Sequence, residues 1–410
     1  MPNWPFRFLH AADFHLETPP FGVDEIPDHL WELFLDAPYR AAERVFDTAL
    51  AENVDFVVLS GDLLHSQHAG PRGPLFLLAQ FERLAARNIA VYWAGGRIDP
   101  PEAWPPSIAL PENVHVFPHG KPEQILHRRA DTPLARLIGA SRSPRAHVRP
   151  EGFDPREAGL FSIAVAHGRA PLESLRMSRV DYWALGGRHA RRTLCEGMPL
   201  AHDPGSPQGR QPEETGAHGC TLVEVDVERN ARLSFVATDI IRWETLEISL
   251  DEQTTREELQ HEMDRRLDSL RQKTPQADLL VSWQVQGSGD LVAQLRRGLL
   301  GPELLGRLRE RFGQGLPVAW SVAMTVEPPA RWQASWYEED TIRGEFLRQL
   351  HHREQDVGEP LGLETCLSGA TLDNRWGELV LNVPEVSRGA LVHEAAMLGV
   401  DLLAGEERES

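Results

Sequence analysis

The chain of 410 residues contains only three cysteines, Cys195, Cys220 and Cys366, and no two of them form a C-x-x-C pair. Isolated cysteines exclude a disulfide framework or a zinc ribbon and are typical of a reducing cytoplasm. No stretch approaches the roughly 18 consecutive apolar residues that a membrane span requires. The segment Met1–Phe8 lacks the basic and apolar regions of a signal peptide. We therefore expect a soluble, cytoplasmic protein of two or three domains that does not insert into a membrane.

Lysine is also nearly absent, since Lys121 and Lys273 are the only two, and the net charge is -19. Such an acidic balance disfavours nonspecific binding to nucleic acids. Between Lys121 and Arg192, however, 14 Lys and Arg residues stand against seven Asp and Glu residues. This basic segment predicts either a phosphate-attracting surface or a set of solvated, ion-paired arginines. Its arginines nearest the motifs described below are Arg128, Arg129, Arg142, Arg145, Arg149, Arg169, Arg176, Arg179, Arg191 and Arg192.

Short β-rich runs alternate with amphipathic helical runs over the first part of the chain, up to residue 243, which predicts an α/β core. A strand is expected at residues 6–12, and a helix is expected to begin at Pro38, with apolar residues at helical spacing after it. Later strands follow one another without helices, which indicates a mixed sheet. The stretch 203–219 is rich in Pro and Gly and is expected to be a loop.

The pattern changes near Trp243. Residues 244–335 are expected to form a smaller α+β domain, with a helix that Thr254 caps and that runs to about Gln272. Residues 336–410 show helical patterns at 341–350 and 387–403. Their apolar spacing suits packing within the same domain or a contact with another chain.

Asp or His side chains directly follow apolar strands at five places in the first region. The five stretches are Asp13-Phe14-His15, Gly61-Asp62-Leu63-Leu64-His65, Gly95-Gly96-Arg97-Ile98-Asp99, His167-Gly168 and Gly186-Gly187-Arg188-His189. Taken singly, an Asp after a strand is more often a turn residue. Taken together, ligands at the ends of neighbouring strands converge, and a mixed Asp and His set suits Mn, Fe or Zn.

The order of these stretches resembles D-x-H, G-D, G-N-H-D, H-G and G-H-x-H, the motifs of the calcineurin-like metallophosphoesterases. The surrounding residues are most similar to the SbcD/YhaO branch, the DNA repair exonuclease subunits. The stretches that carry this resemblance are Phe8–Leu16, Val54–Asp62, Asp181–Gly186, Pro204–Arg210 and Glu214–Val225. The resemblance implies a β-sandwich core flanked by helices over residues 1–243. It also implies a capping domain that contacts DNA at 244–335 and C-terminal helices at 336–410.

Members of this family typically bind two metal ions that share one Asp. Position by position, the resemblance assigns Asp13, His15, Asp62 and His189 to the first ion, and Asp62 and His167 to the second. The Asn ligand of the second ion is replaced by Gly96, and its other His ligand is replaced by Gly187. The His that donates a proton to the leaving group is replaced by Arg97. We therefore expect one ion, with two as the alternative, and Mn2+ as the metal, with Fe and Zn as alternatives.

Two arginines take positions where the second ion would lie, and guanidinium groups bind phosphate well. We expect Arg97 and Arg188 to supply the missing positive charge, together with Arg169 and Arg191 as contacts to substrate phosphate. His65 or Asp99 would replace the lost proton donor, although a turn histidine such as His65 is more often simply exposed.

Three functions remain open from the sequence. The first is metal-dependent hydrolysis of DNA phosphodiesters, and the second is a catalytically inactive subunit that binds DNA or a nucleotide. The third is a small-molecule phosphodiesterase, since a fold does not fix a substrate. The family resemblance implies a coiled-coil ATPase of the SbcC or Rad50 type as partner. We expect that partner to bind the C-terminal region, and family members often form homodimers.

Overall fold

The computed structural model describes residues 4–24, 26–65, 70–142, 147–155, 159–327, 334–355 and 385–406. The chain divides into two compact units. The first unit comprises Met1–Glu244, Arg271–Val281 and Gly315–Val322, and the second comprises Thr245–Leu270, Ser282–Gln314 and Ala323–Ser410. Within the described ranges, no helix is both long enough and apolar enough to cross a bilayer.

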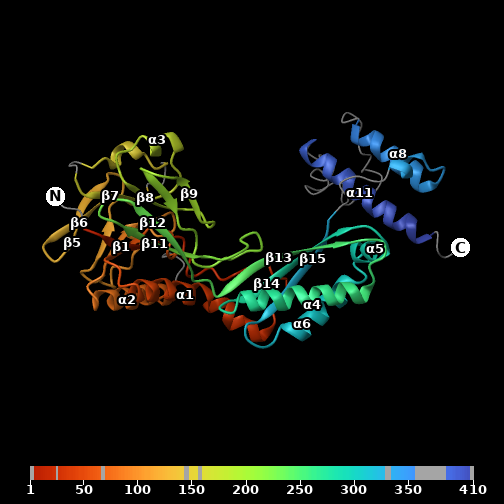
Figure 1. The fold of residues 1–410 in the computed structure, drawn as a ribbon, viewed down its shortest axis with the longest axis horizontal. Coiled ribbons are helices and arrows are strands. Elements are labelled where there is room, and N and C mark those ends of the chain that lie inside the picture. Colours follow the sequence, from red (N-terminus) through yellow and green to blue (C-terminus); the bar gives the residue numbers. More distant parts are fainter. Residues whose placement is uncertain are drawn as a thin grey trace. The chain divides into compact units, whose positions relative to one another are not determined.

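Two six-stranded mixed sheets form the core of the first unit (Figure 1). In spatial order, the first sheet contains β12 (Ala231–Ala237), β11 (Gly219–Val225), β1 (Phe6–Ala11), β2 (Phe56–Leu59), β3 (Ala90–Ala94) and β4 (Val114–Phe117). The second contains β5 (Glu123–Arg129), β6 (Thr132–Ala140), β7 (Phe161–His167), β8 (Tyr182–Gly186), β10 (Leu200–Asp203) and β9 (Arg192–Cys195). The expected β-sandwich flanked by helices is confirmed.

Alternation along β1 explains how the two sheets pack. Phe6 and Phe8 belong to the apolar layer between the sheets, whereas Leu9 and Ala11 belong to the layer beneath the helices. Successive strand residues point to opposite faces, so one strand contributes to both layers. From the second sheet, Ile163 of β7 completes the inner layer. β1 and β7 are therefore held by a common core, and Asp13 and His167 lie at or just after the carboxyl ends of these strands.

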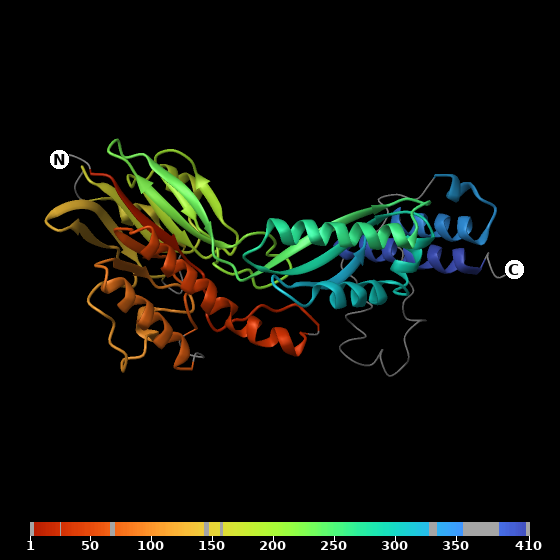
Figure 2. The same cartoon turned by 60° about the horizontal axis from the view of Figure 1, so that its bottom comes forward.

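Helices cover the outer face of each sheet. In the first unit α1 (Asp28–Ala51) and α2 (Arg72–Ala85) lie side by side over the first sheet, as Figure 2 shows. The second sheet is covered by α3 (Leu172–Arg176) and by a short helical turn at Pro150–Phe153. A further turn at Pro101–Ala103 follows β3.

The expected start of α1 at Pro38 is wrong, because the helix begins at Asp28 and Pro38 lies inside it. Leu30, Phe34 and Ala37 are buried and extend the apolar face upstream at helical spacing. Their burial compensates for the backbone hydrogen bond that a proline removes from a helix.

A three-stranded sheet, in the order β13 (Ile241–Leu250), β14 (Asp278–Gly287) and β15 (Ala319–Val326), continues into the second unit. This unit also contains α4 (Arg256–Lys273), α5 (Asp290–Arg296) and α6 (Gly301–Phe312). The start of α4 is capped by Thr255, not by the expected Thr254. The Thr255 N–H donates to Glu258, and Glu258 N–H donates back to the Thr255 hydroxyl.

The C-terminal helices are α7 (Ala334–Glu338), α8 (Ile342–Gln355) and α11 (Glu385–Glu406), so helices form where both patterns predicted them. Leu347 of α8 and Val400 of α11 are buried, and Gly399 allows the ring of Phe346 to approach closely. Residues 356–384 and 407–410 of the region expected to bind a partner lie outside the described residues.

A buried network of polar side chains joins the two sheets beneath the ends of their strands. His10 lies between the Tyr182 hydroxyl at 2.9 Å and the Ser60 hydroxyl at 2.6 Å. The His202 ring stacks edge-on against His10 and hydrogen-bonds Thr221 at 2.9 Å. Burial and the nearby Arg191 charge lower the pKa of His202 to about 3, so this imidazole folds in its neutral form.

This burial predicts a loss of stability in acid. In the unfolded chain His202 becomes protonated below pH 6.5. In the folded protein its imidazole stays neutral down to about pH 3, because its pKa is lowered to that value. Lowering the pH from 7 to 5 should therefore cost on the order of 2 kcal/mol of unfolding free energy through this residue. We expect urea unfolding of His202→Gln to show a correspondingly shallower pH dependence than the wild type. Parallel pH profiles for the two proteins would contradict the prediction.

Candidate metal centre

Side chains with metal-ligating atoms converge at the carboxyl ends of strands from both sheets. Asp13 and His15 follow β1, Asp62 follows β2, His167 ends β7 and His189 follows β8. Strands β1 and β2 are parallel, as are β7 and β8, so each pair presents its carboxyl ends together. All of these side chains are buried except His189, which is half-buried.

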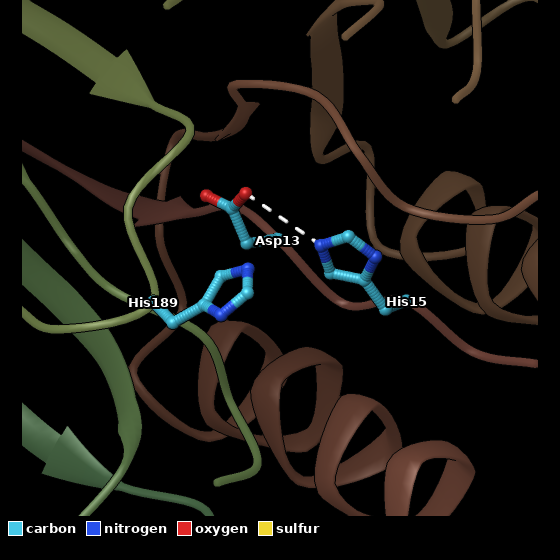
Figure 3. A group of neighbouring side chains, drawn as sticks. All are labelled: Asp13, His15 and His189. Carbon is cyan, nitrogen blue, oxygen red and sulfur yellow. Dashed lines mark ion pairs between the residues drawn. The ribbon is translucent and has the colours of Figure 1, made fainter. Parts of the chain in front are cut away.

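The ligand atoms fall into two overlapping groups. One group comprises Asp13, His15 and His189, and the other comprises Asp13, Asp62 and His167, with all ligand atoms of a group within 4.8 Å of one another. His15 Nε2 lies 3.8 Å from Asp13 Oδ1 and 4.0 Å from Asp62 Oδ2. Figure 3 shows Asp13 and His15 approaching from the loop after β1, with His189 opposite them. The structure thus brings together all five side chains that the sequence assigned to metal binding.

The two buried imidazoles present Nε2 toward the carboxylates. His167 Nδ1 donates to the Ser60 carbonyl at 2.7 Å, which leaves Nε2 facing Asp62 Oδ2 at 3.5 Å. Burial opposes protonation of His167, but the Asp62 carboxylate prevails and raises its pKa to about 9. His15 differs, because burial and the Arg210 charge lower its pKa. The Asp62 carboxylate therefore favours a positive charge next to His167.

Three of the ligand residues adopt a left-handed backbone conformation. The φ angles are 55° at Asp13, 48° at His15 and 55° at Asp62. Such angles are uncommon for residues other than glycine and cluster at functional sites. The two loops stabilise one another, since Asp13 N–H donates to the Gly61 carbonyl and His15 N–H to the Asp62 carbonyl.

Backbone N–H groups occupy the side of the centre where the two substituted ligands would lie. Asp62 Oδ1 accepts hydrogen bonds from the N–H groups of Arg97 at 2.5 Å and Ile98 at 3.0 Å. Asp13 Oδ2 accepts one from Gly187 at 2.8 Å. A β-carbon at Gly96 would collide with the Asp62 carboxylate. An asparagine therefore cannot take this position without moving the loop.

Asp99 organises this loop. Its carboxylate accepts hydrogen bonds from the backbone N–H groups of Asp62, Leu63 and Gly96, at 2.9, 3.0 and 2.6 Å, and from the Trp93 indole at 3.1 Å. Burial and the Asp62 charge nevertheless raise the pKa of Asp99 to about 7. Because four donors surround the carboxylate, Asp99 holds the turns after β2 and β3 together. The geometry gives it no free oxygen for protonating a leaving group.

Two further charged residues lie against His189. Glu214 accepts a hydrogen bond from His189 Nδ1 at 2.6 Å, which directs Nε2 into the centre. Arg210 Nη2 lies 3.0 Å from Nδ1 and 2.9 Å from Nε2 of His189, so the guanidinium sits over the ring. Arg210 Nε is buried and has no hydrogen-bond partner among the described residues. Burial opposes ionisation of Glu214, but hydrogen bonds from His189 and from the Arg210 backbone lower its pKa. The sequence did not single out Arg210 and Glu214, although both lie in stretches that carried the family resemblance.

The arginines expected to bind phosphate have different surroundings. The Arg97 side chain is exposed and makes no ion pair with the described residues. Arg188 is half-buried, and its charge only partly opposes the burial and the Asp13 charge that raise the pKa of Asp203. Arg169 is exposed, and the Arg191 guanidinium lies 5.4 Å from the centre of the Phe235 ring. His65 is half-buried, and its backbone N–H donates to Glu17. Arg145 lies outside the described residues.

The donor set fits one divalent ion. His15 Nε2 is buried and has no hydrogen-bond partner among the described residues, as expected of an atom that a metal would bind. Asp13, Asp62 and His189 would complete a mixed oxygen and nitrogen set of the kind that Mn, Fe and Zn accept, and His167 lies in the other group, with Asp13 and Asp62. The residues do not fit a second ion of the family type, because positions 96 and 187 are glycines.

Parts of the chain are similar to known proteins. The model of the calcineurin-like phosphoesterase family matches residues 6–186. An uncharacterized metallophosphoesterase, YhaO of Bacillus subtilis (strain 168), is 29% identical over 336 residues, which cover 78% of this chain and 81% of that protein. A dimetal phosphatase from Danio rerio covers 55% of this chain and 94% of its own, with 12% identity and a TM-score of 0.34. Residues 6–186 are thus similar to the calcineurin-like phosphoesterase family.

Proposed function

We propose that the protein is a metal-dependent phosphodiesterase of the DNA repair exonuclease type that uses one Mn2+ ion. The observation that carries this proposal is the buried His15 Nε2, which has no hydrogen-bond partner in the described part of the chain and faces the carboxylates of Asp13 and Asp62. When bound, a divalent ion would neutralise charge on the phosphoryl group and make water a stronger nucleophile at neutral pH. His167 and His189 complete the proposed ligand set.

The protein's own residues would position the substrate. Arg97 and Arg188, which directly follow Gly96 and Gly187, would bind the nonbridging oxygens of the phosphate. Arg210, next to His15 and His189, would bind the same phosphate once its guanidinium leaves the His189 ring. His65, three residues after Asp62, stays the proposed proton donor to the leaving oxygen.

The resemblance of the Pro204–Arg210 stretch to the SbcD/YhaO branch supports DNA over a small molecule as substrate. It also supports an SbcC-like ATPase as partner, for which α8 and α11 are the proposed docking helices. A cytoplasmic location agrees with both proposals. Faster hydrolysis of a cyclic nucleotide than of linear DNA would instead favour the small-molecule phosphodiesterase.

One observation favours the second candidate, an inactive subunit that binds DNA. Backbone N–H groups already donate hydrogen bonds to one oxygen each of Asp13 and Asp62. Fewer carboxylate oxygens are therefore free to bind metal ions than in a two-metal site. A two-metal mechanism stabilises both the attacking and the leaving oxygen, and this centre has no second ion to do so.

The first prediction from this proposal concerns metal stoichiometry. After loading with Mn2+ and desalting, elemental analysis of the wild type should give one equivalent, and Asp62→Asn should give none, because the substitution removes a charged ligand. Asp226→Asn, which changes an exposed carboxylate, is the matched control and should keep one equivalent. The loaded wild type should also hydrolyse linear DNA, whereas Asp62→Asn should not.

Zero equivalents of Mn2+ in the wild type would contradict the enzyme proposal and favour the inactive subunit. Two equivalents would contradict the single-ion proposal and would assign the Asp13, Asp62 and His167 group to a second ion.

The second prediction concerns Gly96. Although asparagine restores a family ligand, Gly96→Asn should not add a second equivalent of Mn2+, because its β-carbon collides with the Asp62 carboxylate. We expect a lower melting temperature and less than one equivalent. Gly70→Asn is the control, since a β-carbon at Gly70 meets nothing within 4 Å. A stable Gly96→Asn protein with two equivalents would contradict the prediction.

The third prediction separates two roles of Arg210. Its guanidinium competes with a cation for His189 and repels it, so Arg210→Ala should bind Mn2+ about tenfold more tightly in a calorimetric titration. Turnover should nevertheless fall roughly 10²–10³-fold, because a phosphate-binding donor is lost. Arg232→Ala, which changes an exposed arginine of β12, should alter neither quantity. Weaker metal binding by Arg210→Ala would mean that Arg210 supports His189 instead of competing for it.

A further inference from the structure

A pocket of about 710 Å³ opens beside the metal centre in the first unit. Its lining includes His167, which is one of the proposed metal ligands, and the basic side chains of Lys121, Arg142, His147 and Arg149. The volume falls in the range of sites that bind small molecules or single units of a polymer. The proposed metal chemistry involves His167 but no other side chain of this lining.

Backbone hydrogen bonds fix the walls of the pocket to the loops of the metal centre. Arg142 N–H donates to the Gly95 carbonyl at 2.8 Å, and Gly95 begins the turn whose N–H groups bind Asp62. On the other wall, Val148 N–H donates to the Arg169 carbonyl at 3.1 Å, two residues after His167. A group bound in the pocket is therefore held in a defined position relative to the centre.

The positive charges that line the pocket have no acidic partners among the described residues. Elsewhere in the same basic segment, arginines are paired: Arg129 with Asp55 at 2.7 Å and Arg176 with Glu173 at 3.1 Å. Lys121, Arg142 and Arg149 form no such pair with the described residues, among which Glu151 is the only acidic residue of the lining. In a protein with a net charge of -19, unpaired cations around a pocket attract an anionic ligand.

We propose that this pocket binds the nucleotide unit next to the scissile phosphodiester at the end of a single nucleic-acid strand. The proposal rests on the proposed phosphodiesterase function and specifies its substrate. Lys121, Arg142 and Arg149 come from three separate segments, so they can contact successive phosphates of one strand. Val148 and Phe153 provide apolar surface for the sugar and the base.

The experiment measures binding of a fluorescein-labelled octathymidylate with phosphorothioate links, which resist hydrolysis, to the Mn2+-loaded protein by anisotropy. Replacing both arginines, in Arg142→Gln/Arg149→Gln, should raise Kd at least tenfold at 0.1 M salt. The slope of log Kd against log salt should become shallower by about 1.4, because two phosphate contacts with a single strand are lost. The matched control is Arg87→Gln/Arg232→Gln, which removes two exposed arginines outside the pocket and should bind like the wild type.

Metal stoichiometry of the same samples separates this proposal from the proposed function. Wild-type affinity and slope in Arg142→Gln/Arg149→Gln, with one Mn2+ bound, would overturn the pocket assignment and leave the metal chemistry intact. An equal loss of affinity in the control pair would also overturn it, because binding would then follow net charge alone. Selective loss of strand binding in a protein that holds no Mn2+ would support the pocket and overturn the phosphodiesterase.

Discussion

The Asp62 carboxylate divides the centre into two halves, and the rest of the site depends on that division. One oxygen accepts N–H groups from the turn after β3, whereas the other faces the imidazoles of His15 and His167. The first oxygen is held by neutral donors, so only the second is free for a cation. Backbone hydrogen bonds, and not simply the number of carboxylates, thus decide which oxygen of Asp62 can bind an ion.

This arrangement requires a strained backbone, which the surrounding structure holds in place. Residues at positive φ other than glycine carry a cost of order 1–3 kcal/mol each. Asp13, His15 and Asp62 all adopt such angles, and hydrogen bonds between their two loops tie them together. Asp99 adds the turn after β3 to the same assembly through its four donors. The buried layer between the two sheets then keeps the ends of the strands at a fixed separation.

The sequence predicted the strand ends well because a polar side chain directly after an apolar run is a local signal. It did not predict the four-residue strands β9 and β10, which are too short for a clear period. β10 is defined by pairing with β8, and β9 by pairing with β10. The predicted start of α1 is wrong because a proline usually marks the first turn of a helix, whereas here the helix already begins ten residues before Pro38. Arg210 and Glu214 were missed because their importance lies in contacts with His189, 21 and 25 residues away in the chain.

The contact between Arg210 and His189 links metal binding to phosphate binding. The Arg210 guanidinium lies over the His189 ring, next to the nitrogen that faces the centre, so its charge opposes that of a metal ion at this nitrogen. A metal ion bound by His189 would repel the Arg210 guanidinium, and a phosphate that neutralised Arg210 would reduce this repulsion. Such linkage is reciprocal, so each ligand strengthens the binding of the other. An arginine in this place thus couples metal loading to substrate, a role that a second ion would not have.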